Sequence, residues 1–338
     1  MPGNPNGDLV QILNKAFVMT PNCQMMMFIL PFDGGLYSSL KNILDCDMGI
    51  PSQCLRFQKL KPNNGPYLTN VALKVNIKLG GTNHKLKDKL PMFDVPTLIL
   101  GADVTHPSGG SNTPSIAAVV GSVSGSANSY VVKISYQQGR QEYIGDFEEM
   151  FLHCVHAFKT SNKVLPRRII YYRDGVGEGM FKEVKRQEIA AMLSSKTSPR
   201  TLCPNGFQRH GPQVYELHCR HNRRNWNWAS YLQSQAGLQG TSRPTHYHVL
   251  HDENKFTPDS LQDLTNRMCY LQGRCTRSVR IVTAVYHADL VCYRARCHLI
   301  YPEGWSQSSS GKGNLRPEVT AKKVSDKLDG VRSSSYLL

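Results

Sequence analysis

The sequence lacks the features of a secreted or membrane-spanning protein. It contains ten cysteines among 338 residues, yet no two of them have C-x-x-C spacing. It also has no basic N-terminal stretch followed by an apolar segment. We therefore expect no secretory signal, no disulfide framework and a reducing, cytoplasmic compartment. The longest early apolar run, MMMFIL at 25–30, is far shorter than the ~20 residues that cross a bilayer.

Acidic residues are scarce relative to basic ones. Lys and Arg number 40 against 25 Asp and Glu, which gives a formal net charge of +15. Such an excess indicates a polyanionic partner, with nucleic acid as the first choice and a membrane surface as the second. No amphipathic basic helix stands out, so we expect no membrane partner.

The hydrophobic pattern predicts an α/β protein. A hydrophobic fraction of 40% is sufficient for a substantial core in one large domain or two ordinary ones. We expect strands at 25–30, 54–58, 97–104, 115–123, 129–137, 167–174, 214–218 and 245–250. We expect helices from about 36 and at 68–79, 143–159, 179–193, 259–272 and 286–299. From 97 to 193 the order is three strands, helix, strand, helix, with an antiparallel meander first. That is the element order of the ribonuclease H fold.

Two aspartates lie within or at the end of these apolar strands. Asp103 lies in ILGADVTHP, and Asp174 closes RRIIYYRD directly before the glycine-rich GVGEG. A buried charge needs a partner, a metal or a special purpose, although an Asp before a proline turn also serves as a turn cap. If the two strands are neighbours, a divalent cation would relieve the repulsion between the two carboxylates. Paired carboxylates that hold two metal ions can hydrolyse a phosphodiester, so a two-metal nuclease is the leading hypothesis.

Several longer motifs, in a fixed order, resemble the PIWI domain of a eukaryotic Argonaute, most closely of the fungal type. They are GADVTHP, PSIAAVVGS, YYRDGVGEGMF, GLQGTSRPTHYHVL and CTRSVRIVTAVYHADLVCYRARCHL. Upstream, LPFDGGLYSSLKN and LKVNIKLGGTNH resemble the MID domain of the same family. The resemblance implies an RNase H-like PIWI domain preceded by the C-terminal half of a Rossmann-like MID domain, with the N-terminal and PAZ domains absent. The expected division is an unassigned segment 1–24, a partial MID domain 25–90, a PIWI domain 91–302 and a tail 303–338.

The resemblance also implies a site that cleaves RNA paired to a small guide. The family's site consists of Asp, Glu, Asp and a fourth Asp or His; Asp103 matches the first position and Asp174 the third. The Glu falls on Glu142, at the start of the expected helix, where the helix dipole also favours an acid. The fourth position falls on Asp289 and not on His287, because the register of LVCYRARCHL places Asp289 there and a hard oxygen donor suits Mg²⁺ better. Asp103, Asp174 and Asp289 are the expected ligands of two Mg²⁺ ions, with Mn²⁺ as the alternative.

A pocket for the 5′-phosphate of the guide RNA is implied in the same way. A terminal phosphate needs clustered cationic donors, an amide and an aromatic ring on which the first base stacks. The residues that match this pocket are Tyr37, Lys41, Gln53, Lys74, Lys78 and Arg294. Those that match positions along the guide backbone are Arg220, Arg224, Arg243, Arg274 and Tyr286. The implied partners are the guide, a complementary target RNA and proteins of a silencing complex.

The stretch 194–227 departs from the family pattern. Glu216 and His218 interrupt a strand that should be apolar, and a further stretch that contains a strand is missing after Arg224. A lost strand would expose a sheet edge. Three alternatives therefore stay open: a guided endoribonuclease, a guide-binding module that silences through partners without cleavage, and a truncated product without function. The four acidic positions favour the first, whereas the missing parts favour the other two.

Overall fold

The chain forms two compact units. The computed structural model describes residues 5–31, 35–61, 64–107, 113–194, 213–220, 229–237, 240–254, 256–300 and 320–322, with the backbone alone for 5–7, 213–220 and 229. The first unit comprises Met1–Asn83 and Arg294–Leu338, and the second comprises His84–Tyr293. Within the described residues, no helix is both long and apolar enough to cross a membrane.

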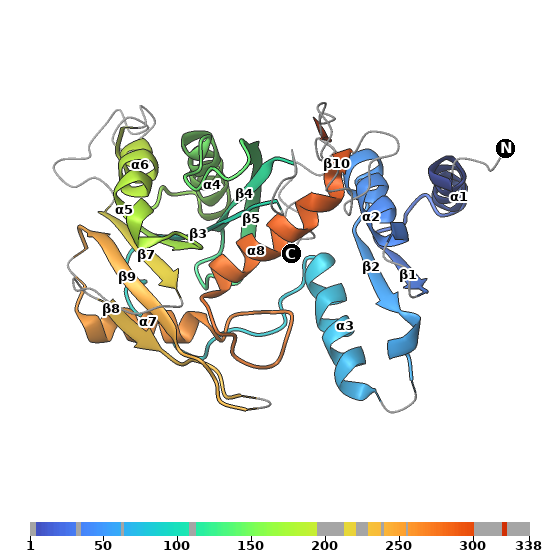
Figure 1. The fold of residues 1–338 in the computed structure, drawn as a ribbon. Helices are drawn as coiled ribbons and strands as arrows, with labels where there is room; N and C mark the ends of the chain where they lie inside the picture. Colours follow the sequence, from blue (N-terminus) through green and yellow to red (C-terminus); the bar gives the residue numbers. More distant parts are fainter. Residues whose placement is uncertain are drawn as a thin grey trace. The chain divides into compact units, whose positions relative to one another are not determined.

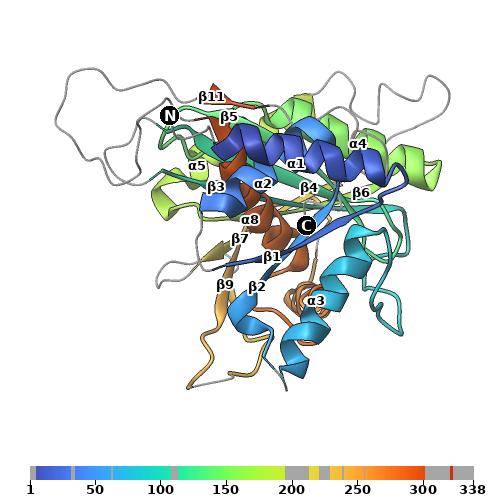
Figure 2. The ribbon, with the colours of Figure 1, turned by 90° about the vertical axis from the view of Figure 1, so that its right-hand side faces the viewer.

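The first unit is built around a short parallel sheet. Its strand β1 (Met26–Leu30) pairs in parallel with β2 (Ser52–Arg56). Its other elements are α1 (Pro5–Met19), α2 (Gly35–Asn42), the π-helical turn Ile43–Met48, the 3₁₀ turn Phe57–Lys59, α3 (Gly65–Lys78), the 3₁₀ turn Arg296–His298, β10 (Leu299–Ile300) and β11 (Thr320–Ala321). The helix α1 lies in the segment 1–24, for which the sequence pattern predicted no secondary structure. Figures 1 and 2 both show α3 beside β2, with which it packs.

The first unit has a small core of its own. Leu30 from β1, Leu40 from α2, and Leu44 and Ile50 from the following turn pack with Leu13 of α1. Each fully buried side chain of this kind stabilises the fold by about 1.5–3 kcal/mol. This packing fixes α2 against the sheet, and α2 carries the candidate anion-binding residues Tyr37 and Lys41.

The second unit is a seven-stranded mixed sheet with helices. Its strands follow the order β5-β4-β3-β6-β7-β9-β8. They are β3 (Thr97–Thr105), β4 (Ser115–Ser122), β5 (Tyr130–Gln137), β6 (Arg168–Asp174), β7 (Gln213–Arg220), β8 (Ala229–Leu232) and β9 (Thr245–Asp252). The helices are α4 (Phe147–Asn162), α5 (Phe181–Val184), α6 (Ala190–Ser194), α7 (Pro258–Met268) and α8 (Thr283–Ala295). The 3₁₀ turn Glu178–Met180 precedes α5, and the π-helical turn Lys185–Ile189 joins α5 to α6.

The sheet has the topology expected from the sequence. Strands β3, β4 and β5 form the antiparallel meander, and β6 returns to lie parallel to β3. The strand β7 is parallel to β6 and antiparallel to β9, with an irregularity between Glu216 and Leu217, where the sequence pattern is broken. The strand β8 pairs with β9 and forms one edge of the sheet.

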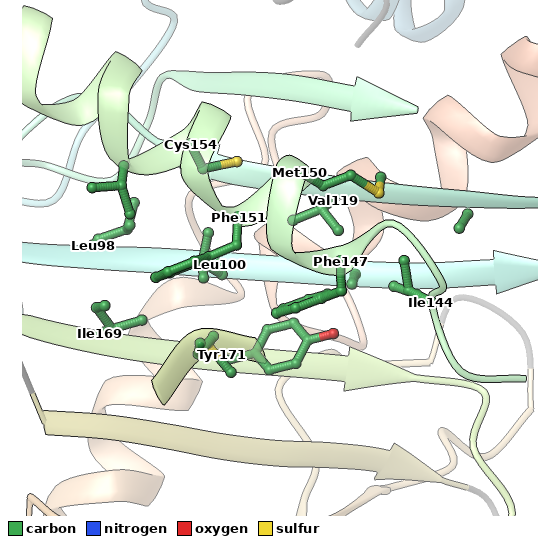
Figure 3. Packing of buried hydrophobic residues seen from close by; sticks show 14 of the residues in the cluster. Leu98, Leu100, Val119, Ile144, Phe147, Met150, Phe151, Cys154, Ile169 and Tyr171 are labelled. Atoms are coloured by element: carbon green, nitrogen blue, oxygen red, sulfur yellow. The ribbon is translucent and has the colours of Figure 1, made fainter. Parts of the chain in front are cut away.

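The main core lies between this sheet and α4. Leu98, Leu100 and Val119 project from the strands toward Phe147 and Phe151 of the helix (Figure 3). The strands β3 and β4 are buried almost throughout, as expected for apolar runs covered on both faces. This packing holds the ends of β3 and β6 rigidly in place.

Some element boundaries differ from those expected. The helix expected at 143–159 begins only at Phe147, so Glu142 lies in the preceding loop and not in a helical first turn. The helix expected at 259–272 ends at Met268, and the one expected at 286–299 runs from Thr283 to Ala295. The loop expected at 194–213 lies mostly outside the described residues.

Candidate active site and anion-binding site

Asp103 and Asp174 lie together at one edge of the large sheet. Ala102 of β3 pairs with Arg173 of β6, so the aspartate that follows each residue reaches the same edge. Gly175 continues from Asp174 with a φ of +84°, a conformation that glycine adopts without strain. A Cβ added at Gly175 would lie 3.5 Å from Asp103 Oδ1. The side chain of Asp103 therefore faces the turn that follows Asp174.

A third carboxylate acts on this pair from α8. Burial, followed by the charges of Asp174 and Asp289, raises the pKa of Asp103 to about 7. Burial also raises the pKa of Asp174, although Gly175 N donates to its Oδ1 at 2.7 Å. The like charge of Asp289 raises the pKa of Asp174 as well. The three aspartates thus repel one another where β3 and β6 end.

His287, the alternative fourth residue, faces elsewhere. Its ring lies 5.1 Å from that of Tyr130, and only 4% of His287 is exposed. Burial, with a smaller effect of Arg274, lowers the pKa of His287 to about 3. His287 is thus a neutral residue packed in the interior, whereas the exposed Asp289 interacts with the aspartate cluster.

Glu142 is held by contacts from β6 and from the loop after β3. Its Oε1 is 3.3 Å from His106 Nε2, and His106 Nδ1 lies 2.9 Å from the hydroxyl of Ser115. The backbone carbonyl of Glu142 accepts a hydrogen bond of 2.5 Å from Nη2 of Arg173. The structure therefore anchors Glu142 at both its side chain and its backbone.

Arg173 is a functional candidate that the sequence analysis did not assign. Its guanidinium is fully buried, and its Nη1 donates to the carbonyl of Asp174. With the bond to Glu142, it joins the strand end to the preceding loop. The only signal of this role in the sequence was a charge that directly follows the apolar run IIYY and precedes Asp174.

The carboxylates fit a divalent cation by their chemistry. Within the described residues, no group of three or more His, Cys, Asp or Glu side chains is arranged so as to hold a metal ion. Asp103, Asp174 and Asp289 nevertheless offer only oxygen donors, which Mg²⁺ and Mn²⁺ prefer. A cation between them would also offset the burial and the like charges that raise the pKa of Asp103.

In the first unit, two lysines converge on β2. Nζ of Lys41 donates to the carbonyl of Ser52 at 3.0 Å, and Nζ of Lys78 donates to the same oxygen at 2.7 Å. Lys78 also donates to Oε1 of Gln53 at 2.9 Å. The ammonium of Lys41 lies 5.6 Å from the centre of the Tyr37 ring. Lys41, Lys78 and Gln53, with Tyr37 beside Lys41, are four residues that the sequence analysis expected in this pocket. They lie around Ser52, which the sequence analysis did not identify.

Arg294 extends this group of cations. Its Nη1 donates to the hydroxyl of Tyr37 at 3.5 Å, while Nε and Nη2 donate to the carboxylate of Asp45. Burial would raise the pKa of Asp45, but Arg294 and then His298 outweigh it and lower that pKa to about 2. Burial, with the charge of Arg294 second, lowers the pKa of Lys41 to about 8. The sequence analysis missed both Asp45 and His298, since nothing local marks them.

The remaining candidates lie on α3, on α8, at the end of β7 and in loops. Lys74 lies one turn before Lys78 on α3 and is half-buried. Arg243 is exposed just before β9, Arg274 is half-buried in the loop between α7 and α8, and Tyr286 is half-buried on α8. Arg220 ends β7, where the backbone alone is described, and Arg224 lies outside the described residues.

The comparisons with known proteins agree with this geometry. A Piwi domain matches residues 25–202 and 223–300. Protein argonaute 5 of Arabidopsis thaliana is 39% identical over 326 residues, which cover 82% of this chain and 32% of that protein. This chain therefore spans about a third of the length of its curated relative.

Two solved structures resemble the whole chain. The C-terminal lobe of a budding yeast Argonaute matches with a TM-score of 0.81 and 26% identity, over 98% of this chain and 72% of that one. The Kluyveromyces polysporus Argonaute with a guide RNA matches with a TM-score of 0.80 and 25% identity, over 100% of this chain and 41% of that one. Because these relatives come from a plant and from yeast, the expected fungal type stays a prediction. The matched domain covers more than half of the chain, which belongs to the Argonaute family and combines an RNase H-like Piwi domain with part of a MID domain.

Proposed function

We propose that this chain acts in RNA silencing guided by a small RNA, and that it cleaves target RNA paired to the guide in a metal-dependent reaction. The meeting of Asp103 and Asp174 at one sheet edge, where the charge of Asp289 acts on both, carries the proposal. Such a cluster is costly without a cation. Family membership, the net charge of +15 and the guide RNA in the Kluyveromyces polysporus structure support it. The eight described cysteines are free thiols, in keeping with a cytoplasmic location.

The cations around Ser52 are proposed to bind the 5′-phosphate of the guide. Lys41, Lys78 and Arg294 provide charged donors, and Gln53 provides an amide beside them. The ring of Tyr37 offers a surface on which the first base can stack. Phosphate bound here would be recognised by its charge and without regard to base sequence. Lys74 and the exposed or half-buried Arg243, Arg274 and Tyr286 are proposed to add phosphate contacts.

Asp103, Asp174 and Asp289 are proposed to hold two Mg²⁺ ions, with Mn²⁺ as an alternative. When bound, such ions activate a water molecule and stabilise the leaving oxygen of a phosphodiester. In the chain itself, Arg173 holds the backbone of Asp174 and of Glu142, and His106 holds the Glu142 carboxylate. Glu142 is proposed as the fourth catalytic carboxylate, and these contacts determine where it lies.

A cleavage assay tests this proposal directly. The purified chain would be incubated with a 5′-phosphorylated guide, a labelled complementary target and Mg²⁺, alongside the variants Asp103→Ala and Asp174→Ala. We expect the parent to cut the target once, opposite the guide, and both variants to be inactive. If the variants cut as fast as the parent, these carboxylates are not the active site.

One observation favours a second function, guide binding without cleavage. The carboxylate of Glu142 is paired with His106 Nε2 at 3.3 Å. A chain whose fourth carboxylate stays there would bind guide and target and would silence through proteins of a silencing complex. Tight binding of a 5′-phosphorylated guide without cleavage at any Mg²⁺ or Mn²⁺ concentration would select this function.

A further inference from the structure

Glu188 is a buried carboxylate to which the proposed chemistry gives no role. Its exposed fraction is 0%, and it lies in the π-helical turn Lys185–Ile189 between α5 and α6. A π-helical turn interrupts the regular helical spacing and often occurs at functional sites. A carboxylate in such a position is costly unless it is paired and hydrogen-bonded. The partners of Glu188 should therefore explain its presence.

Three groups converge on this carboxylate. The backbone N–H of Ile144 donates to Oε1 at 3.0 Å, and the hydroxyl of Tyr171 donates to Oε2 at 2.7 Å. Nε of Arg173 lies 3.5 Å from Oε1, and both members of this ion pair are fully buried. Glu188 thus bonds directly to the loop that carries Glu142 and to two residues of β6.

Arg173 carries this connection further. Its other donors reach the backbone carbonyls of Glu142, at 2.5 Å, and of Asp174. The loop is therefore held at two points, the carbonyl of Glu142 by Arg173 and the N–H of Ile144 by Glu188. The end of β6 is held at the carbonyl of Asp174 by the same arginine. One carboxylate thus sets the distance between two segments that carry candidate catalytic residues.

We propose that Glu188 is a positioning residue of the active site, which holds the loop carrying Glu142 against the strand end carrying Asp174. This inference rests on the function proposed above. An ordinary buried ion pair would contribute to stability alone. Here, however, Glu188 and Arg173 also bind backbone groups of the loop that carries Glu142 and of the strand end that carries Asp174. Loss of the pair should therefore change the geometry of the site.

The variant Glu188→Gln tests this role. Glutamine keeps the size of the side chain and one oxygen acceptor, but it removes the charge that orients Arg173. The matched control is Glu183→Gln on the neighbouring α5, where the carboxylate accepts from Arg186 and Gln187 near the surface. Both variants would be compared with the parent in single-turnover cleavage, guide affinity and amide hydrogen exchange.

For Glu188→Gln we expect cleavage slower by about tenfold or more, since a hydrogen bond to a charged group is lost. Guide affinity should stay within about twofold of the parent, because the anion-binding residues are untouched. Amide exchange should accelerate at Ile144 and in the segment 140–146, and not elsewhere in the sheet. Glu183→Gln should match the parent in every measurement.

Two results would overturn the inference. One is cleavage by Glu188→Gln at the parental rate. The other is unchanged exchange at Ile144. If the parent itself does not cleave, the proposed nuclease function fails, and the exchange measurement alone then decides whether Glu188 fixes the loop.

Discussion

Arg294 donates two hydrogen bonds to the carboxylate of Asp45, from Nε at 2.5 Å and from Nη2 at 2.9 Å. His298 Nε2 lies 3.0 Å from the same carboxylate. Because Nε and Nη2 bind Asp45, the remaining nitrogen Nη1 points toward the hydroxyl of Tyr37, to which it donates at 3.5 Å. A buried acid therefore determines how one cation of the proposed phosphate site is oriented.

The variant Asp45→Asn should be strongly destabilised. It leaves the buried Arg294 without its counter-charge, and breaking such a pair costs about 3–5 kcal/mol. Urea unfolding measures this loss. The control is Asp47→Asn, two positions away in the same turn, where a 40% exposed side chain pairs with Lys322. That variant should lose less than about 1 kcal/mol. Equal losses in the two variants would contradict the importance of the Asp45–Arg294 pair.

Recognition of a 5′-phosphate should weaken at alkaline pH. Because burial and then Arg294 lower the pKa of Lys41 to about 8, the ammonium is charged below pH 8 and loses its proton above it. Phosphate binding above pH 8 must then be coupled to uptake of a proton, so affinity should fall by up to about tenfold per pH unit. The phosphate itself is fully ionised there, since its second pKa is about 6.

Guide affinities measured from pH 7 to pH 9.5 would check this dependence. A guide with a 5′-hydroxyl should show little change over the same range, because it has no phosphate to meet Lys41. The variant Lys41→Arg should flatten the profile, since a guanidinium stays charged throughout. An unchanged slope in that variant would mean that another group titrates.

Gly175→Ala should destabilise the strand end at the active site. The residue has a φ of +84°, and the added Cβ would lie 3.5 Å from Asp103 Oδ1. Backbone strain of this kind costs about 1–2 kcal/mol, which urea unfolding would detect, and cleavage should slow as well. Gly179→Ala serves as the control, because no atom lies within 4 Å of its added Cβ. If the two alanine variants behave alike, the backbone at Gly175 is not under this constraint.

Much of the sheet could be predicted from the sequence because its strands are continuous apolar runs between clear turns. Asp103 and Asp174 stood out for the same reason, as charges among apolar residues. Glu142 was harder to place, since acids in GRQEYIGDFEE suit a helical first turn and the helix begins only at Phe147. Its loop conformation depends on His106, Arg173 and Glu188, which come from distant parts of the chain.

The buried acids that hold arginines could not be found from sequence patterns. Asp45 and Glu188 both lie in π-helical turns, which break the 3.6-residue periodicity on which helix prediction depends. The partner of Asp45 is Arg294, 249 positions later. Such pairs follow from tertiary packing, and only the assembled fold brings their members together.

Asp289→Asn and His287→Ala should separate catalysis from stability on one helix. Asp289 is exposed and acts on the aspartate cluster, so its variant should keep the parental melting temperature and lose about 100-fold or more in cleavage rate, as for a lost metal ligand. His287 is buried against Tyr130, so its variant should melt earlier because truncation leaves a cavity. Thermal melting and single-turnover cleavage of both variants provide the comparison. Full activity in Asp289→Asn would show that the register assigned from the family motif is wrong. His287 would then be the candidate for the fourth position of the site.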